Sequence, residues 1–144
     1  LFMSKTVKIV IGLLFIVVVL VILFLVFQSN SQKYQIHILD FNRITSVSVD
    51  ALTQKDNIKE FNDKETIEKI YRIFSNKTTN KESIYDNPTN PDELYFVTFK
   101  DNEDHYSSAY IYKRSNNYYI EQPYNGIYSS SSTDFEFVQS LMKQ

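Results

Sequence analysis

The hydrophobic pattern of the sequence begins with one long apolar run. Residues 9–27 read IVIGLLFIVVVLVILFLVF and contain no charged or polar side chain. As a helix this run is about 28 Å long, close to the hydrocarbon thickness of a bilayer. A helix that is apolar on every side suits lipid better than the surface of a small domain. The run therefore predicts a transmembrane helix, and its partner is the lipid bilayer.

The flanks of this run predict its orientation. Lys5 and Lys8 precede it, whereas Lys33 alone follows closely. Positive charge is retained in the cytoplasm, which predicts a cytoplasmic tail at 1–8 and a non-cytoplasmic remainder. The run exceeds a typical signal-peptide core, and no small-x-small cleavage site follows it. We therefore expect an uncleaved signal anchor at 9–27 in the cell membrane, with a single pass and a C-terminal extracytoplasmic part.

After a polar stalk at 28–33, the pattern becomes that of one folded domain at 34–144. Segments with alternating or continuous apolar residues predict strands, and two amphipathic segments predict helices. The expected strands are 34–41, 44–52, 58–61, 93–100, 105–114 and 118–122, and the segment 77–92 is expected to be irregular. The order β-β-(β)-α-β-β-β-α predicts an α+β fold with an antiparallel sheet of five to six strands and two helices.

Capping residues mark the start of both predicted helices. Asp63 precedes an apolar stripe that contains Ile67, Ile70 and Phe74, and Asn76 is a plausible end. In the second helix, Thr133 is followed three residues later by Glu136, the spacing of a capping box.

The stretch YYIEQPYNGIY at 118–128 holds one of the two glycines of the chain. Asn-Gly is a strong hairpin signal, because a type I′ turn needs positive φ at both central residues. We therefore expect Asn125 and Gly126 to form a structural turn; the alternative for Gly126 is the floor of a binding pocket.

Composition excludes several chemistries. The chain has no cysteine, which removes disulfides, thiolate metal sites, cysteine nucleophiles and lipid attachment through cysteine. Outside the cytoplasmic tail the acidic residues outnumber the basic ones, 17 to 13, once Lys5 and Lys8 are set aside. This balance gives no electrostatic footprint for nucleic acid. No glycine-rich phosphate loop and no Gly-x-Ser-x-Gly motif occurs.

Metal and catalytic sites are not indicated either. His37 and His105 lack the spacing of a ligand pair, and DNEDH at 101–105 reads as a solvated turn rather than a calcium loop. We therefore expect no metal, no cofactor and no catalytic residue that the sequence identifies, although a pair of carboxylates meeting in the fold stays open.

Tyrosine is concentrated in the predicted domain. All eleven tyrosines lie beyond residue 33, and seven of them lie between 106 and 128. Two interpretations compete: a sheet face covered by a helix, or an exposed aromatic platform that binds an envelope protein or a cell-wall glycan. The candidate partner-binding residues are Tyr106, Tyr110, Tyr112, Tyr118 and Tyr119.

Two stretches carry a resemblance: ITSVSV…IKEFNDKETIEKIYRIF within 44–74, and YYIEQPYNGIY at 118–128. Together they resemble a family of small membrane-anchored or lipid-linked proteins of low-GC Gram-positive bacteria, defined as a domain of unknown function. The resemblance implies an extracytoplasmic α+β domain and brings no catalytic residue. Many lipid-linked relatives would carry a lipobox cysteine, which this chain lacks.

These observations favour a non-enzymatic binding or accessory module that acts on a protein or envelope partner. Two alternatives stay open: an envelope hydrolase with a carboxylate acid/base pair, and a self-protection factor against a secreted toxin.

Overall fold

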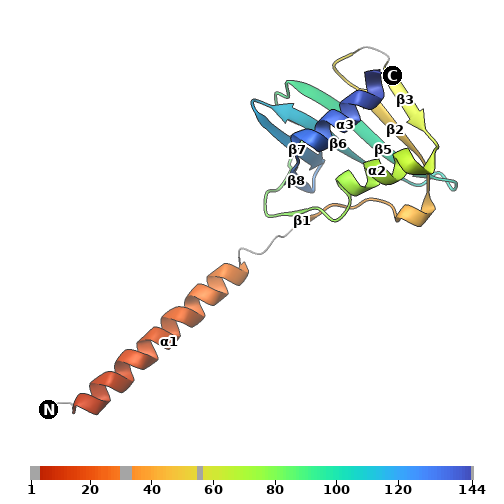
Figure 1. The fold of residues 1–144 in the computed structure, drawn as a ribbon. Helices are drawn as coiled ribbons and strands as arrows, with labels where there is room; N and C mark the ends of the chain where they lie inside the picture. The colour runs from red at the N-terminus through yellow and green to blue at the C-terminus, as the bar shows by residue number, and fades with distance from the viewer. Residues whose placement is uncertain (1–3, 30–33, 55–56, 144) are drawn as a thin grey trace. The chain divides into compact units, whose positions relative to one another are not determined.

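The computed structural model of the chain describes residues 4–29, 34–54 and 57–143 (Figure 1). The chain forms two compact units, one up to Ser31 and one from Gln32 onward. The first unit contains helix α1, Lys5–Ser29, which begins before the predicted span. Every described side chain from 4 to 27 is exposed. The first three residues of the predicted tail and residues 30–33 of the predicted stalk lie outside the described residues.

The second unit is an α+β domain with a six-stranded antiparallel sheet, as predicted. The sheet order is β3-β2-β5-β6-β7-β8. Its strands are β2 (Ile44–Ala51), β3 (Ile58–Phe61), β5 (Glu93–Asp101), β6 (Tyr106–Arg114), β7 (Asn117–Gln122) and β8 (Gly126–Ser129). Helices α2 (Lys64–Phe74) and α3 (Ser132–Lys143) cover one face of the sheet (Figure 1).

The main hydrophobic core lies between the sheet and these two helices. Alternation along the strands sends one set of side chains to this face, and β2 contributes Val47 and Val49, which are fully buried. From the helices, Ile70 and Val138 are equally buried in the same cluster. Burial of each such side chain contributes about 1.5–3 kcal/mol, so this face carries most of the stabilisation of the domain.

The helix ends confirm one predicted cap and correct another. Asp63 accepts a hydrogen bond from the Thr66 N–H at 2.8 Å, and Asn76 follows α2 with a φ of 57°. At α3, however, the Ser131 hydroxyl accepts the Asp134 N–H at 3.0 Å, so the cap lies two residues before Thr133. Ser131 and Asp134 have the same three-residue spacing as the predicted pair, and that is why the sequence left the start ambiguous.

The predicted first strand at 34–41 is mostly not a strand. Only β1, Tyr34–Gln35, pairs, and its partner is β4, Thr78–Thr79, inside the segment predicted to be irregular. The Ile36 N–H still bonds the Lys77 carbonyl at 2.9 Å. Farther along, side chains replace ladder partners: Gln122 Oε1 accepts the His37 N–H, and the Ser107 hydroxyl accepts the Leu39 N–H. The segment then enters a short 3₁₀ helix, η1, Phe41–Arg43.

The hairpin at Gly126 also differs from the expectation. Neither glycine has positive φ, whereas Tyr124 has a φ of 57°. The Asn125 N–H bonds the Gln122 carbonyl at 3.0 Å, so Pro123 and Tyr124 are the central residues of the turn. Positive φ at the second central residue after proline is typical of a type II turn. Gly126 is the first residue of β8 and pairs with Gln122, so the type I′ prediction is wrong.

Gly126 is glycine for a different reason. A Cβ built on it would lie 2.7 Å from the Tyr128 hydroxyl and 2.8 Å from Thr79 Cγ2. Close approach of neighbouring groups, rather than backbone conformation, therefore requires a residue without a side chain.

The two ends of the sheet have different surroundings. At one end lie the 101–105 turn, the 123–125 turn and the segment 34–43, which the bonds of Gln122 and Ser107 hold there. We call this end the Tyr34 end. The opposite end carries the 115–116 turn and the start of the 52–57 connection.

A loop covers the sheet face that the helices leave open. Residues 80–92, here called the strap, begin beside β8 and the 123–125 turn, where the Ser83 N–H bonds the Asn125 carbonyl. The strap ends at the opposite end of the sheet, where the Asp92 N–H bonds the Lys113 carbonyl. Between these points Asn87 accepts the Tyr110 hydroxyl at 2.6 Å.

Candidate functional site

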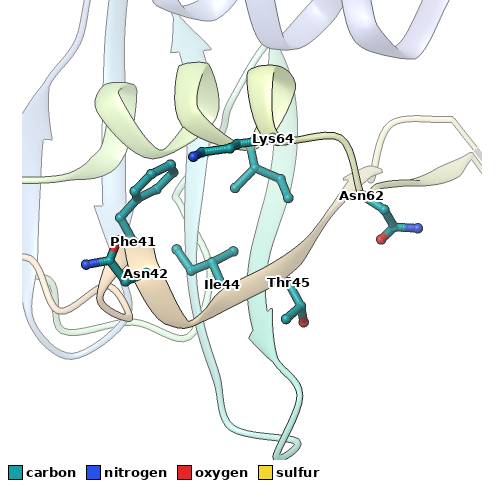
Figure 2. Close-up of a pocket in the computed structure, with 7 residues that line it drawn as sticks. Phe41, Asn42, Ile44, Thr45, Asn62 and Lys64 are labelled. Carbon is teal, nitrogen blue, oxygen red and sulfur yellow. The ribbon is translucent and has the colours of Figure 1, made fainter.

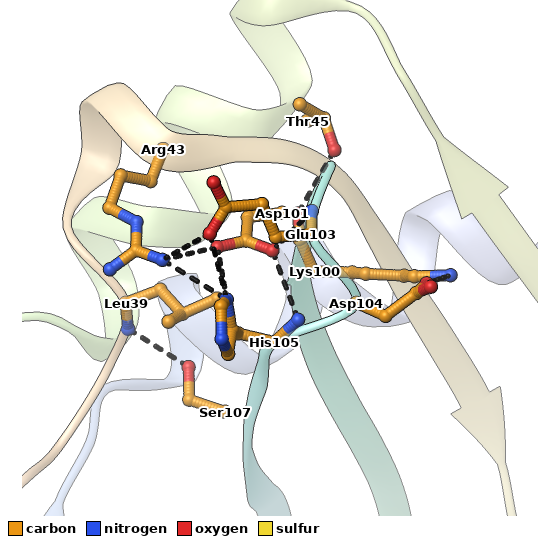
Figure 3. Close-up of polar contacts among 9 residues, drawn as sticks. All are labelled: Leu39, Arg43, Thr45, Lys100, Asp101, Glu103, Asp104, His105 and Ser107. Carbon is orange, nitrogen blue, oxygen red and sulfur yellow. Dashed lines mark hydrogen bonds and ion pairs between the residues drawn. The ribbon is translucent and has the colours of Figure 1, made fainter.

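The candidate site is built on η1, at the Tyr34 end of the sheet. Arg43, the last residue of η1, donates to Asp101 Oδ2 at 2.6 Å (Figure 3). Asp101 ends β5, and its side chain is 1% exposed. Its other oxygen, Oδ1, accepts the backbone N–H groups of Glu103 at 2.8 Å and His105 at 3.0 Å. The carboxylate of Asp101 thus fixes both η1 and the 101–105 turn.

The environment of Asp101 favours its charged form. Burial alone would raise the pKa of its carboxyl. The two backbone donors, the His105 ring and the Arg43 guanidinium outweigh burial and lower the pKa of Asp101 to about 2. The sequence-based expectation of a solvated turn is therefore wrong for Asp101, although Glu103 and His105 are exposed.

The same cluster has the composition of a metal site. One ligand atom each from Asp101, Glu103 and His105 lies within 4.8 Å of the others. The Arg43 guanidinium, however, stands among them, at 3.2 Å from His105 Nδ1 and 3.8 Å from Glu103 Oε2. The guanidinium supplies the positive charge that a metal ion would otherwise bring to the two carboxylates. We therefore assign this cluster a structural role, that of holding η1 against the sheet.

The 3₁₀ helix η1, which Arg43 holds against the sheet, borders a pocket of about 360 Å³ that lies between η1 and α2 (Figure 2). We call it the η1–α2 pocket. Its apolar lining is Phe41, Ile44 and Ile67, and its polar lining is Asn42, Thr45, Asn62 and Lys64. The Phe41 ring packs on Tyr71 of α2 at 5.3 Å between centroids, which holds this lining residue against the helix.

The pocket lining carries a single charged side chain, that of Lys64. Its lining contains one ammonium group, two amides and one hydroxyl, and none of its residues is a carboxylate, histidine or cysteine. Lys64, the first residue of α2, contributes the cationic side chain of this lining. The pocket can hold a small apolar group beside an anionic or carbonyl oxygen.

Of the five predicted tyrosines, the structure brings Tyr110, Tyr112 and Tyr119 together and leaves Tyr106 and Tyr118 apart. Tyr110 and Tyr112 are buried on the sheet face that the strap covers, and Tyr119 stacks on Tyr112 at 5.4 Å. Tyr118 points to the helix-covered face, where its ring contacts Phe135. Tyr106 alone among the five is exposed, at 73%. The covering element over Tyr110 and Tyr112 is the strap rather than a helix, so these two residues do not form an exposed platform.

Beneath the strap lies a buried acid that sequence reasoning did not single out. Glu121 is 3% exposed; the Ser83 hydroxyl donates to one of its oxygens at 2.6 Å and the Tyr112 hydroxyl to the other at 2.9 Å. Burial and the neighbouring Glu121 raise the pKa of the Tyr112 hydroxyl. Glu121 and Asp101 are the buried acids of the described residues, and neither lines the η1–α2 pocket.

Comparisons with known proteins agree with this architecture. A family model described as "Domain of unknown function (DUF5300)" matches residues 32–129. A solved protein described as "NMR structure of the protein from Ruminococcus gnavus" is 26% identical, with a TM-score of 0.54. That match covers 68% of this chain and 96% of the other. A search of curated proteins finds no match. The chain belongs to the family described as Domain of unknown function (DUF5300), whose model covers most of its α+β domain.

Proposed function

We propose that this protein is a single-pass membrane protein whose domain binds a protein or glycan partner in the envelope of a low-GC Gram-positive bacterium. Helix α1 carries the proposal. Among the described residues it is the one helix long and apolar enough to cross a membrane, over Lys5–Phe27. The exposure of its side chains on all sides supports lipid as the surrounding medium rather than a protein core.

The orientation follows from charge. Lys5 and Lys8 lie at the N-terminal end of α1, and the basic side of a span stays in the cytoplasm. The domain is then extracytoplasmic. The lack of cysteine is compatible with that location, because the hydrophobic core and the hydrogen-bonded turns hold the domain without disulfides.

The η1–α2 pocket is the site at which the domain would receive its partner. Its apolar lining and the Lys64 ammonium suit a small apolar group next to an anionic oxygen, and Asn42 and Asn62 lie on opposite sides of the pocket (Figure 2). This combination occurs in peptide segments and in acylated or carboxylated glycans. The absence of an acid/base pair from this lining favours binding over hydrolysis.

Location is tested in intact cells that express the chain with a C-terminal tag. External protease should remove the tag, and alkaline carbonate should leave the chain in the membrane pellet; a cytoplasmic protein serves as control. A tag that stays protected would contradict the orientation. A mature N-terminus beyond Phe27 would show that α1 is a cleaved signal sequence and would contradict the anchor.

Binding is tested with a photoreactive amino acid placed at Asn62 on the pocket. The matched control places it at Leu52, an exposed position that follows the opposite end of β2. Irradiation of cells should give a discrete adduct from position 62 that is lost when Lys64→Ala is added. An identical adduct pattern from positions 62 and 52 would contradict the pocket as the binding site.

A further inference from the structure

The exposed large hydrophobic side chains of the domain are unevenly placed. Outside α1, those of the described residues are Leu52, Ile58, Ile84, Tyr85, Tyr106 and Tyr124. Leu52 and Ile58 lie at the opposite end of the sheet, since Ile58 pairs with Asp50 near the end of β2. The other four lie at the Tyr34 end, as the following contacts show.

Ile84 and Tyr85 are held at this end by the residues on either side of them. The Ser83 N–H bonds the Asn125 carbonyl, and Asp86 accepts the Tyr124 hydroxyl at 2.6 Å. Tyr85 and Tyr124 are 58% and 68% exposed. The Tyr124 hydroxyl is therefore bonded to the strap while most of the Tyr124 side chain stays in solvent.

Tyr106 begins β6 directly after the 101–105 turn, and it pairs with Lys100. It lies at the same end of the sheet as the 123–125 turn, because the Gln122 amide donates to the neighbouring Ser108 carbonyl. We call Ile84, Tyr85, Tyr106 and Tyr124 the exposed aromatic end.

Few residues separate α1 from the domain in the sequence. Four residues separate Ser29 from Tyr34. Four residues with their flanking bonds span at most about 18 Å, whatever their conformation. Tyr34 lies beside the 123–125 turn, because the next residue, Gln35, accepts the Asn125 amide at 2.7 Å.

We propose that the exposed aromatic end docks into the headgroup region of the bilayer that α1 spans. This inference rests on the proposed membrane anchor. Tyrosine favours the membrane–water interface, where its ring is shielded from water and its hydroxyl stays hydrated. Tyr124 has that arrangement, with its hydroxyl on Asp86 and its ring exposed.

The charges near the exposed aromatic end indicate whether docking requires anionic lipid. Glu82 and Asp86 lie on the strap beside Tyr124, and Lys81 stands over the Tyr119 ring at 5.8 Å. Lys100 lies opposite Tyr106, but its ammonium pairs with Asp104 at 2.8 Å. No basic cluster therefore accompanies these side chains among the described residues of the strap. Docking depends on apolar insertion rather than on anionic lipid.

The test uses the full chain in phosphatidylcholine nanodiscs. The sequence contains no tryptophan, so a single introduced indole is the only one in the chain, and the emission of discs that hold the parent chain is subtracted. Tyr85→Trp and Tyr124→Trp are the test variants, and Leu52→Trp and Ile58→Trp are the matched controls. Brominated acyl chains should cause a loss of emission in both test variants, relative to unbrominated discs, and no loss in either control.

Equal emission in brominated and unbrominated discs for both test variants would overturn the docking surface while leaving the anchor intact. A chain that does not copurify with discs would overturn the anchor and, with it, the docking surface. Each variant is first checked for the melting temperature of the parent, and agreement between the two test positions guards against a local effect of one substitution.

Discussion

Arg43 and Asp101, 58 residues apart in the sequence, form a 2.6 Å ion pair that joins η1 to the end of β5. The guanidinium side chain is half exposed, whereas the carboxylate is buried and saturated with donors. A single carboxylate therefore organises the turn that follows β5 and the 3₁₀ helix that precedes β2. Because η1 forms one wall of the η1–α2 pocket, this pair sets the shape of the proposed binding site.

The first prediction concerns the pH dependence that Asp101 gives to folding. Its pKa is about 2 in the folded state against an ordinary value of 3.8. A lowered pKa stabilises the fold above the ordinary value, and this contribution is lost as pH falls from 3.8 towards 2. Asp101→Asn should therefore melt at a lower temperature than the parent at neutral pH. The difference in melting temperature between Asp101→Asn and the parent, measured by circular dichroism, should decrease as the pH falls from 3.8 towards 2.

Glu103→Gln is the matched control for this experiment. Glu103 lies on the same turn, but its carboxylate is 68% exposed and 3.8 Å from Arg43. Such surface pairs contribute about 0–1 kcal/mol, so this variant should follow the parent closely. A melting difference for Asp101→Asn that stays constant from neutral pH to pH 2 would contradict the assignment.

The second prediction concerns Gly126. Gly126→Ala should reduce the free energy of unfolding by about 1–3 kcal/mol, the usual range for overpacking, because the new methyl meets Tyr128 and Thr79. The steric cause can be separated from backbone strain with Tyr128→Leu. In that background the alanine should cost less, since the ring that it meets is gone. An equal cost in both backgrounds, measured by urea unfolding, would contradict the steric explanation.

Local sequence patterns predicted most of the fold. The alternation in β2, the continuous apolar character of β5 and the stripe on α2 each depend on neighbours a few residues away, and all three elements formed as expected. The failures have a common cause. The extended segment after Tyr34 and the turn at Tyr124 depend on Gln122, Ser107 and Thr79, and the sequence does not show that these residues come close in space.

The candidate site was less predictable than the fold. Arg43 lies in FNR, which reads only as a turn, and Asp101 lies in an acidic stretch that is typical of a solvated loop. Glu121 lies between Ile120 and Gln122 on β7, and nothing in the local sequence indicates that it is buried. In each case the partner comes from a distant element, so the hydrogen bonds that define the site exist only after the sheet has formed.

The third prediction tests the corrected start of α3. Ser131→Ala removes the hydroxyl that accepts the Asp134 N–H and should destabilise the domain by about 1 kcal/mol, the usual cost of a lost N-cap. Thr133→Ala is the matched control within the helix and should cost less. The two variants are compared by urea unfolding. A larger loss for Thr133→Ala would restore the cap that the sequence pattern favoured.

The fourth prediction concerns the strap. Ser83→Ala removes the donor to one oxygen of buried Glu121 and leaves that oxygen without its hydroxyl partner. An unsatisfied buried acceptor costs about 1–3 kcal/mol, and part of this cost can be avoided if the strap lifts and water reaches Glu121. The variant should therefore lose stability. Under native conditions limited proteolysis should cut it within 80–92 faster than the parent, with sites identified by mass spectrometry.

Ser140→Ala, which removes an exposed hydroxyl bonded to the Phe137 carbonyl, is the control and should leave the cleavage rate unchanged. Faster cleavage spread evenly over the domain would indicate global destabilisation instead, and an unchanged rate within 80–92 would show that Ser83 does not hold the strap.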